Sequence, residues 1–86
     1  MTKNVKSLAT RLKKIEGQVR GLQKMIEDDK YCIDIITQTS ATRNALKSFE
    51  DNILEDHLKT CVVSQVKSNQ EDKAVKEILR VYKLKR

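Results

Sequence analysis

Apolar side chains recur every three or four positions along most of this chain, which is the spacing of one face of an α-helix. The first such segment runs from about Val5 to Glu27, and the polar residues 28–30 separate it from a second one. The second segment begins near Tyr31 and keeps its pattern to about Val66 without a glycine or a proline. We therefore predict one continuous helix of roughly 35 residues there, because nothing in the sequence forces a break.

A third helix is expected to follow residue 68. Ser68 and Glu71 match a capping box, in which a serine and a glutamate three residues later satisfy free amides at a helix start. The apolar pattern then continues to about Leu84. We predict an all-α fold and a single domain covering residues 1–86.

The predicted core is small. The chain has 86 residues, two tyrosines, one phenylalanine and no tryptophan. A layer of three helices of this size buries few side chains by itself, so we expect an oligomer whose interface completes the core.

The formal net charge of +6 at pH 7 indicates an anionic partner, with nucleic acid first and a membrane surface second. No apolar run approaches the roughly 18 residues of a membrane span, and no signal peptide opens the chain. We therefore expect a cytoplasmic protein with no membrane partner. Because cytosolic thiols stay reduced, the two cysteines suggest metal binding, redox chemistry or packing rather than a structural disulfide.

The two cysteines and the single histidine fall on one face of the predicted long helix. At about 100° per residue, His57 lies at about −20° and Cys61 at about +20° from Cys32. Cys32 and Cys61 are nevertheless roughly 44 Å apart along a continuous helix, so one chain cannot place both on one ion. A second copy packed antiparallel would bring Cys32 beside His57 and Cys61 of the partner subunit.

This residue set leaves three interpretations open. Two thiolates and an imidazole form a soft donor set that suits Cu(I), whereas structural zinc usually takes four protein ligands and no fourth is evident. The cysteines are equally compatible with thiol redox chemistry. A cysteine on an apolar face also packs as a small hydrophobic side chain.

Three motifs make the chain similar to a known family. The segments RLKKIEGQVRG (residues 11–21), YCIDIITQTSA (residues 31–41) and LEDHLKTC (residues 54–61) resemble the CsoR/RcnR family of bacterial metal-sensing repressors, and they fall at that family's spacing. The resemblance implies a three-helix protomer, an antiparallel dimer with a four-helix core and a disc-shaped tetramer. It also implies a repressor that binds double-stranded operator DNA in the apo form and is released by its inducer.

The resemblance is greatest to the copper-sensing branch, which implies about one Cu(I) per protomer. The ligands would be Cys32 from one protomer with His57 and Cys61 of the partner subunit. Tyr31 and Glu77 stand where that branch has residues that support the ligands. Nickel and cobalt sensors of the family carry a histidine where Cys61 stands here.

Candidate phosphate contacts are the basic residues of the first two helices. Arg11 matches a basic position that contributes to operator binding in the family, whereas a second such position is occupied here by Ser48, for which the adjacent Lys47 is a substitute. Most contacts of this kind position a protein on DNA rather than specify a sequence. The full set is Arg11, Lys13, Lys14, Arg20 and Lys24 with Arg43 and Lys47.

Two other classes of function stay open. One is a thiol-based repressor of the same family that senses persulfide or electrophiles, in which His57 would be dispensable. The other is a copper chaperone, which would not need the basic first helix. An enzyme acting on a small-molecule substrate is not expected, since the chain has one histidine, no glycine-rich phosphate loop and no paired catalytic carboxylates.

Overall fold

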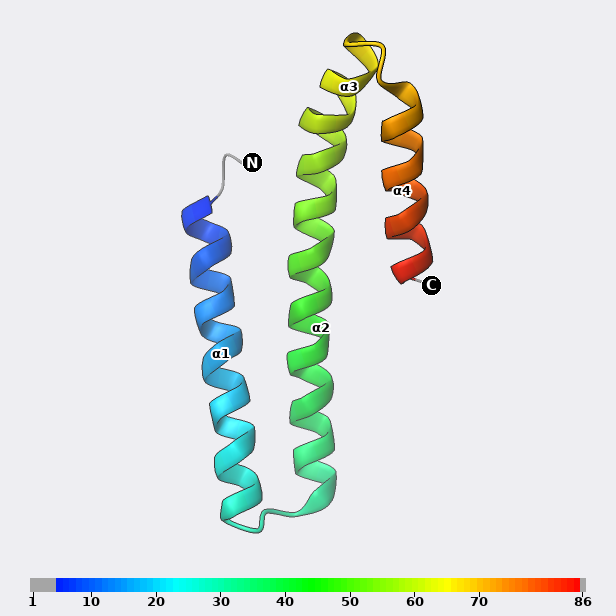
Figure 1. The fold of residues 1–86 in the computed structure, drawn as a ribbon. Coiled ribbons are helices and arrows are strands. Elements are labelled where there is room, and N and C mark those ends of the chain that lie inside the picture. The colour runs from blue at the N-terminus through cyan, green and yellow to red at the C-terminus, as the bar shows by residue number, and fades with distance from the viewer. Residues whose placement is uncertain (1–4, 86) are drawn as a thin grey trace. The chain divides into compact units, whose positions relative to one another are not determined.

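A computed structural model describes residues 5–85, and every regular element among them is helical (Figure 1). This confirms the predicted all-α fold. In chain order the elements are α1 (Val5–Glu27), α2 (Cys32–His57), the π-helical turn η1 (Leu58–Val62), α3 (Val63–Lys67) and α4 (Glu71–Lys85). No helix among the described residues is long and apolar enough to cross a membrane.

The chain divides into two compact units, and the boundary falls inside α2, between Ile53 and Leu54. In the first unit, α1 has the bounds that its apolar period predicts, and it buries Leu8 and Ile15. The Arg11 guanidinium lies 3.5 Å from the Ser48 hydroxyl, so α1 and α2 approach each other at this point.

The second unit contains η1, α3 and α4. Ala74 on α4 is its buried apolar side chain, with 4% of its surface exposed. A hydrogen bond from Gln65 Nε2 on α3 to Glu77 Oε1 on α4, 2.9 Å long and partly buried, joins these two helices. The second unit therefore contains one small buried apolar side chain, Ala74, and one polar contact between α3 and α4.

The predicted continuous α-helix after Tyr31 is wrong in one respect. Residues 32–67 are helical throughout, but α2 ends at His57 and the next five residues form η1 before α3 begins. A π turn closes i→i+5 rather than i→i+4 hydrogen bonds, so it is wider than an α turn. The uniform rotation of about 100° per residue that placed Cys61 in the sequence analysis therefore does not hold across η1.

Both chain reversals begin with the same backbone motif. After α1, the amide of Asp29 donates to Ile26 O at 3.1 Å and that of Lys30 to Met25 O at 3.0 Å. This pair of bonds is a Schellman motif, in which one residue takes the left-handed conformation, and Asp29 has φ 52°.

The second reversal shows that the predicted capping box is wrong. Asn69 has φ 59°, and the amides of Asn69 and Gln70 donate to Val66 O at 3.2 Å and Gln65 O at 2.7 Å. Ser68 is thus the C-cap of α3 and not the N-cap of α4, which begins at Glu71. A Schellman motif at α3 uses the residues that the capping box would need.

The first of these turns predicts a stabilising substitution. Asp29→Gly should raise the free energy of unfolding by about 1 kcal/mol, because glycine adopts φ 52° without steric cost and a negative charge leaves the negative end of the α1 dipole. The expected rise in Tm is about 4–8 °C at fixed protomer concentration, measured by circular dichroism.

The neighbouring Asp28→Gly is the control for that measurement. Asp28 also carries a charge at the end of α1, but it has no positive φ, and its amide donates to Lys24 O at 2.8 Å. It should raise Tm by less than Asp29→Gly or lower it, since the gain from removing the charge is offset by the unfolded-state entropy that glycine adds. An equal rise in both variants would contradict the explanation by backbone conformation.

The chain by itself buries very little apolar surface. Among the described apolar side chains only Leu8, Ile15 and Ala74 are buried, and the one buried polar residue is Thr42. Large apolar side chains are instead exposed on every long helix, where they are available to pack against a partner surface. They include Leu12, Val19 and Ile26 on α1, Ile33, Ile36 and Leu46 on α2, and Val75, Leu79 and Tyr82 on α4.

Candidate functional site

Cys32 is the first residue of α2, and its thiol is free and exposed. Tyr31 precedes the helix, and its carbonyl accepts hydrogen bonds from the amides of Asp34 at 3.0 Å and Ile35 at 3.2 Å. The Tyr31 side chain is 68% exposed. Both side chains are therefore open to a partner at the start of the helix.

His57 and Cys61 lie where the helix changes from α to π. His57 is the last residue of α2, Cys61 lies inside η1, and both are partly buried. The Cys61 thiol is free. Because π turns are rare and occur often at functional sites, their coincidence with two of the three predicted ligands supports a functional role for this segment.

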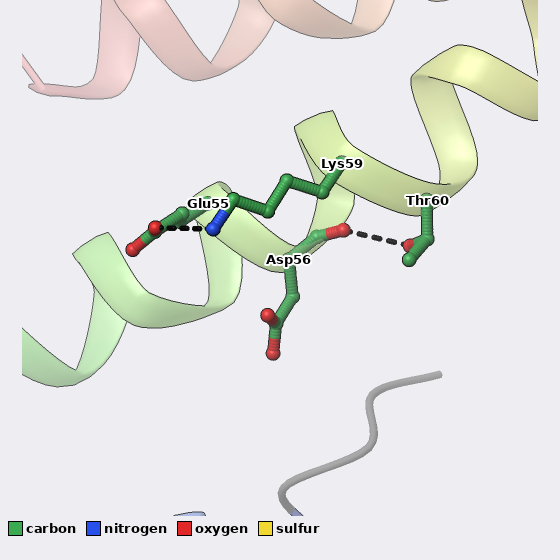
Figure 2. Close-up of polar contacts among 4 residues, drawn as sticks. All are labelled: Glu55, Asp56, Lys59 and Thr60. Atoms are coloured by element: carbon green, nitrogen blue, oxygen red, sulfur yellow. Dashed lines mark hydrogen bonds and ion pairs between the residues drawn. The ribbon is translucent and has the colours of Figure 1, made fainter.

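Two polar contacts join the end of α2 to this turn (Figure 2). The Thr60 hydroxyl donates to Asp56 O at 2.7 Å, and such a bond to the carbonyl four residues earlier bends helices. The same hydroxyl lies 3.7 Å from Cys61 Sγ. The sequence analysis did not single out Thr60, because its contacts with Asp56 and Cys61 are visible only in the structure.

The other contact in Figure 2 is an ion pair between Lys59 and Glu55, with Nζ 2.8 Å from Oε1. The hydrogen bond that Lys59 donates to Glu55, and then the negative charge of Glu55, raise the pKa of Lys59. Both side chains are largely exposed, so the pair contributes little to stability. The ion pair does hold the Lys59 side chain of η1 against the end of α2.

Glu77 is the one predicted supporting residue with a described side-chain partner, since it accepts the hydrogen bond from Gln65. Gln65 stands four residues after Cys61, which is about one helical turn. The sequence analysis missed Gln65, because only the fold brings residues 65 and 77 together.

The donor set fits a soft metal ion chemically. Cys32 and Cys61 provide two free thiols and His57 an imidazole, and such donors suit soft or borderline ions such as Cu(I) and Zn²⁺. Within residues 5–85 of a single chain, the structure contains no group of three or more histidine, cysteine, aspartate or glutamate side chains that could hold a metal ion.

The predicted phosphate contacts are exposed on α1 and α2. Arg20 forms an ion pair with Glu16, 3.1 Å long, which partly neutralises it. Arg11 lies beside Ser48. The two positions that the family resemblance associates with operator binding therefore occupy one surface of the first unit. The other exposed members of the set are Lys13, Lys14, Lys24, Arg43 and Lys47.

A second group of exposed basic residues follows α4 and was not predicted as a phosphate surface. These residues recur every three or four positions, which places them along one face of the helix. They are Lys73, Lys76, Arg80 and Lys83.

Residues 4–83 match the family model described as "Metal-sensitive transcriptional repressor". The chain belongs to this family, as the three motifs predicted. It is 45% identical over 82 residues to the copper-sensing transcriptional repressor CsoR of Bacillus subtilis, which covers 95% of this chain and 81% of that one. It is 51% identical over 65 residues to the copper-sensing repressor RicR of Mycobacterium tuberculosis, covering 76% and 68% of the two chains.

Solved structures agree with this assignment. The copper-sensing repressor CsoR with Cu(I) from Geobacillus thermodenitrificans has a TM-score of 0.92 at 39% identity, covering 98% of this chain and 88% of that chain. The nickel-responsive regulator InrS has a TM-score of 0.82 at 25% identity, covering 96% and 93%. These relatives are transcriptional regulators rather than enzymes.

Proposed function

We propose that this protein is a Cu(I)-responsive transcriptional repressor of the cytoplasm. It binds operator DNA in the apo form and leaves the DNA when Cu(I) occupies its sensing site. The observation that carries the proposal is the donor set of two free thiols and one histidine, two of them at a π turn, in a metal-sensitive repressor. The similarity to copper-sensing relatives points to the same metal.

The sensing site takes Cys32 from one protomer and His57 and Cys61 of the partner subunit. Cys32 and His57 stand at opposite ends of α2, a helix of 26 residues, so a second copy is the simple way to supply all three donors. An antiparallel dimer with a four-helix core provides two such sites, and two dimers form the tetramer. The exposed apolar side chains of α1, α2 and α4 supply surface for these interfaces.

Release of DNA follows from linkage between the two binding events. If Cu(I) binds more tightly to a tetramer conformation that fits DNA poorly, it weakens DNA binding by the same factor by which DNA weakens Cu(I) binding. Tyr31 and Glu77 are the side chains proposed to support the ligands in this change. The DNA surface comprises Arg11 and Lys47 with the neighbouring basic residues of α1.

The experiment that tests the proposal is an anaerobic titration of the reduced protein with Cu(I). Thiolate-to-copper absorption reports binding, and the anisotropy of fluorescent promoter DNA reports release. The expected result is saturation at about one Cu(I) per protomer with a parallel loss of DNA binding, by about 5–150-fold in affinity.

A persulfide donor added in place of Cu(I) is the second arm of this experiment. DNA binding that ignores Cu(I) but falls with persulfide would contradict the proposal and assign the protein to sulfur sensing. Tight Cu(I) binding by a protein that never binds promoter DNA would instead indicate a copper chaperone.

A further inference from the structure

The hydrogen bond between Gln65 and Glu77 connects the segment that carries Cys61 to the last helix. Gln65 Nε2 donates to Glu77 Oε1 at 2.9 Å, and both side chains are partly buried. A donor of fixed position restricts the orientation of a carboxylate more strongly when water is partly excluded. The bond therefore fixes the Glu77 carboxylate relative to α3.

The second polar atom of the Gln65 side-chain amide, Oε1, argues against a purely structural role for this residue. Gln65 Oε1 is buried and has no hydrogen-bond partner among the described residues. A buried acceptor without a partner is unfavourable, and leucine, which is similar in size, would fill the same space without it. Packing alone gives no reason for an amide at this position.

The place of Gln65 in the chain suggests what the amide does. It stands about one turn after Cys61, and α3 continues from η1 without a break. A change in the width of η1 changes the rotation of α3 and so moves the Gln65 side chain. Glu77, held by that side chain, would then move with it.

We propose that Gln65 is a positioning residue of the sensor, which transmits a change at Cys61 to α4 through its hydrogen bond with Glu77. This inference rests on the proposed function, since it concerns the coupling between Cu(I) and DNA binding. Gln65 is neither a proposed Cu(I) ligand nor a proposed DNA contact. Its removal should reduce the coupling and leave both separate binding reactions nearly unchanged.

The test compares the DNA affinity of each variant with and without saturating Cu(I). Gln65→Leu should fold, bind about one Cu(I) per protomer and bind promoter DNA in the apo form within about twofold of wild type, while the factor by which Cu(I) weakens DNA binding falls about fivefold or more. Gln18→Leu is the matched control. Gln18 is a partly buried glutamine of α1 whose Oε1 also lacks a described partner, and its replacement should leave the coupling factor unchanged.

A second pair of variants reverses the direction of the hydrogen bond. Gln65→Glu alone places two carboxylates together and should reduce the coupling, whereas Gln65→Glu combined with Glu77→Gln restores one donor and one acceptor and should recover most of it. If Gln65→Leu does not fold, recovery of the coupling factor in the double variant tests the role of Gln65 instead. A merely structural contact would show rescue in Tm without rescue in coupling.

The outcomes separate the two proposals. Full coupling in Gln65→Leu, or no recovery of coupling in the double variant, overturns the role of Gln65 and leaves the copper sensor intact. A wild-type protein whose DNA affinity ignores Cu(I) overturns the proposed function and this inference with it.

Discussion

Cys32→Ala should bind promoter DNA like the wild type and no longer respond to Cu(I). The wild-type factor of about 5–150 in DNA affinity should fall below about twofold, because the variant lacks one of the three proposed ligands and the remaining proposed pair would not join two protomers at one ion. Cys32 is exposed in the first turn of α2, so the substitution leaves no cavity. DNA anisotropy titrations with and without Cu(I) measure the factor.

His57→Ala is the variant that distinguishes metal ligation from sulfur chemistry. It keeps both thiols, so a persulfide sensor would respond in full, whereas a copper sensor should lose most of its response. The wild type treated with a persulfide donor is the parallel control. A Cys32→Ala protein that still responds fully to Cu(I) would show that the assigned ligand set is wrong.

The regular helices were predictable from the sequence because their signals are local. The apolar period of α1 gave its bounds, and the polar residues 28–30 gave the reversal after it. The helix-forming composition between residues 31 and 66 likewise gave continuous helix. Periodicity reports the average turn and cannot locate a single wide one, so the π turn at Leu58–Val62 was missed.

The error at Ser68 has a different cause. The spacing of Ser68 and Glu71 is a valid start signal, but Asn69 next to it is also a residue that tolerates the left-handed conformation of a helix end. The start signal of α4 and the end signal of α3 thus overlap at residues 68–70. The structure adopts the helix end, since both hydrogen bonds of the Schellman motif are formed.

The candidate site likewise contains some residues that the sequence could identify and others that it could not. Residue types and spacing singled out Cys32, His57 and Cys61, because soft donors are rare in this chain and stand out against its composition. Gln65 and Thr60 are common polar residues, and their significance lies in which atoms they contact. Such contacts depend on the fold and carry no signal in a single sequence.

Arg11→Ala should weaken apo DNA binding by on the order of tenfold or more and leave Cu(I) binding unchanged. Arg11 lies beside Ser48 on an exposed surface of α1 and α2, with Lys47 next to it, where a guanidinium can reach phosphate. Each lost phosphate contact should also make the slope of log K against log salt concentration shallower by about 0.9. Anisotropy titrations at several salt concentrations measure both quantities.

Arg80→Ala is the matched control, since Arg80 is an exposed arginine on α4 that is not among the predicted phosphate contacts. It removes the same charge from the protein, so a general effect of net charge would weaken DNA binding equally in both variants. An unchanged salt slope in Arg11→Ala with a reduced slope in Arg80→Ala would move the DNA surface to α4. The opposite result would place it on α1, because only a side chain that displaces counterions from DNA changes the slope.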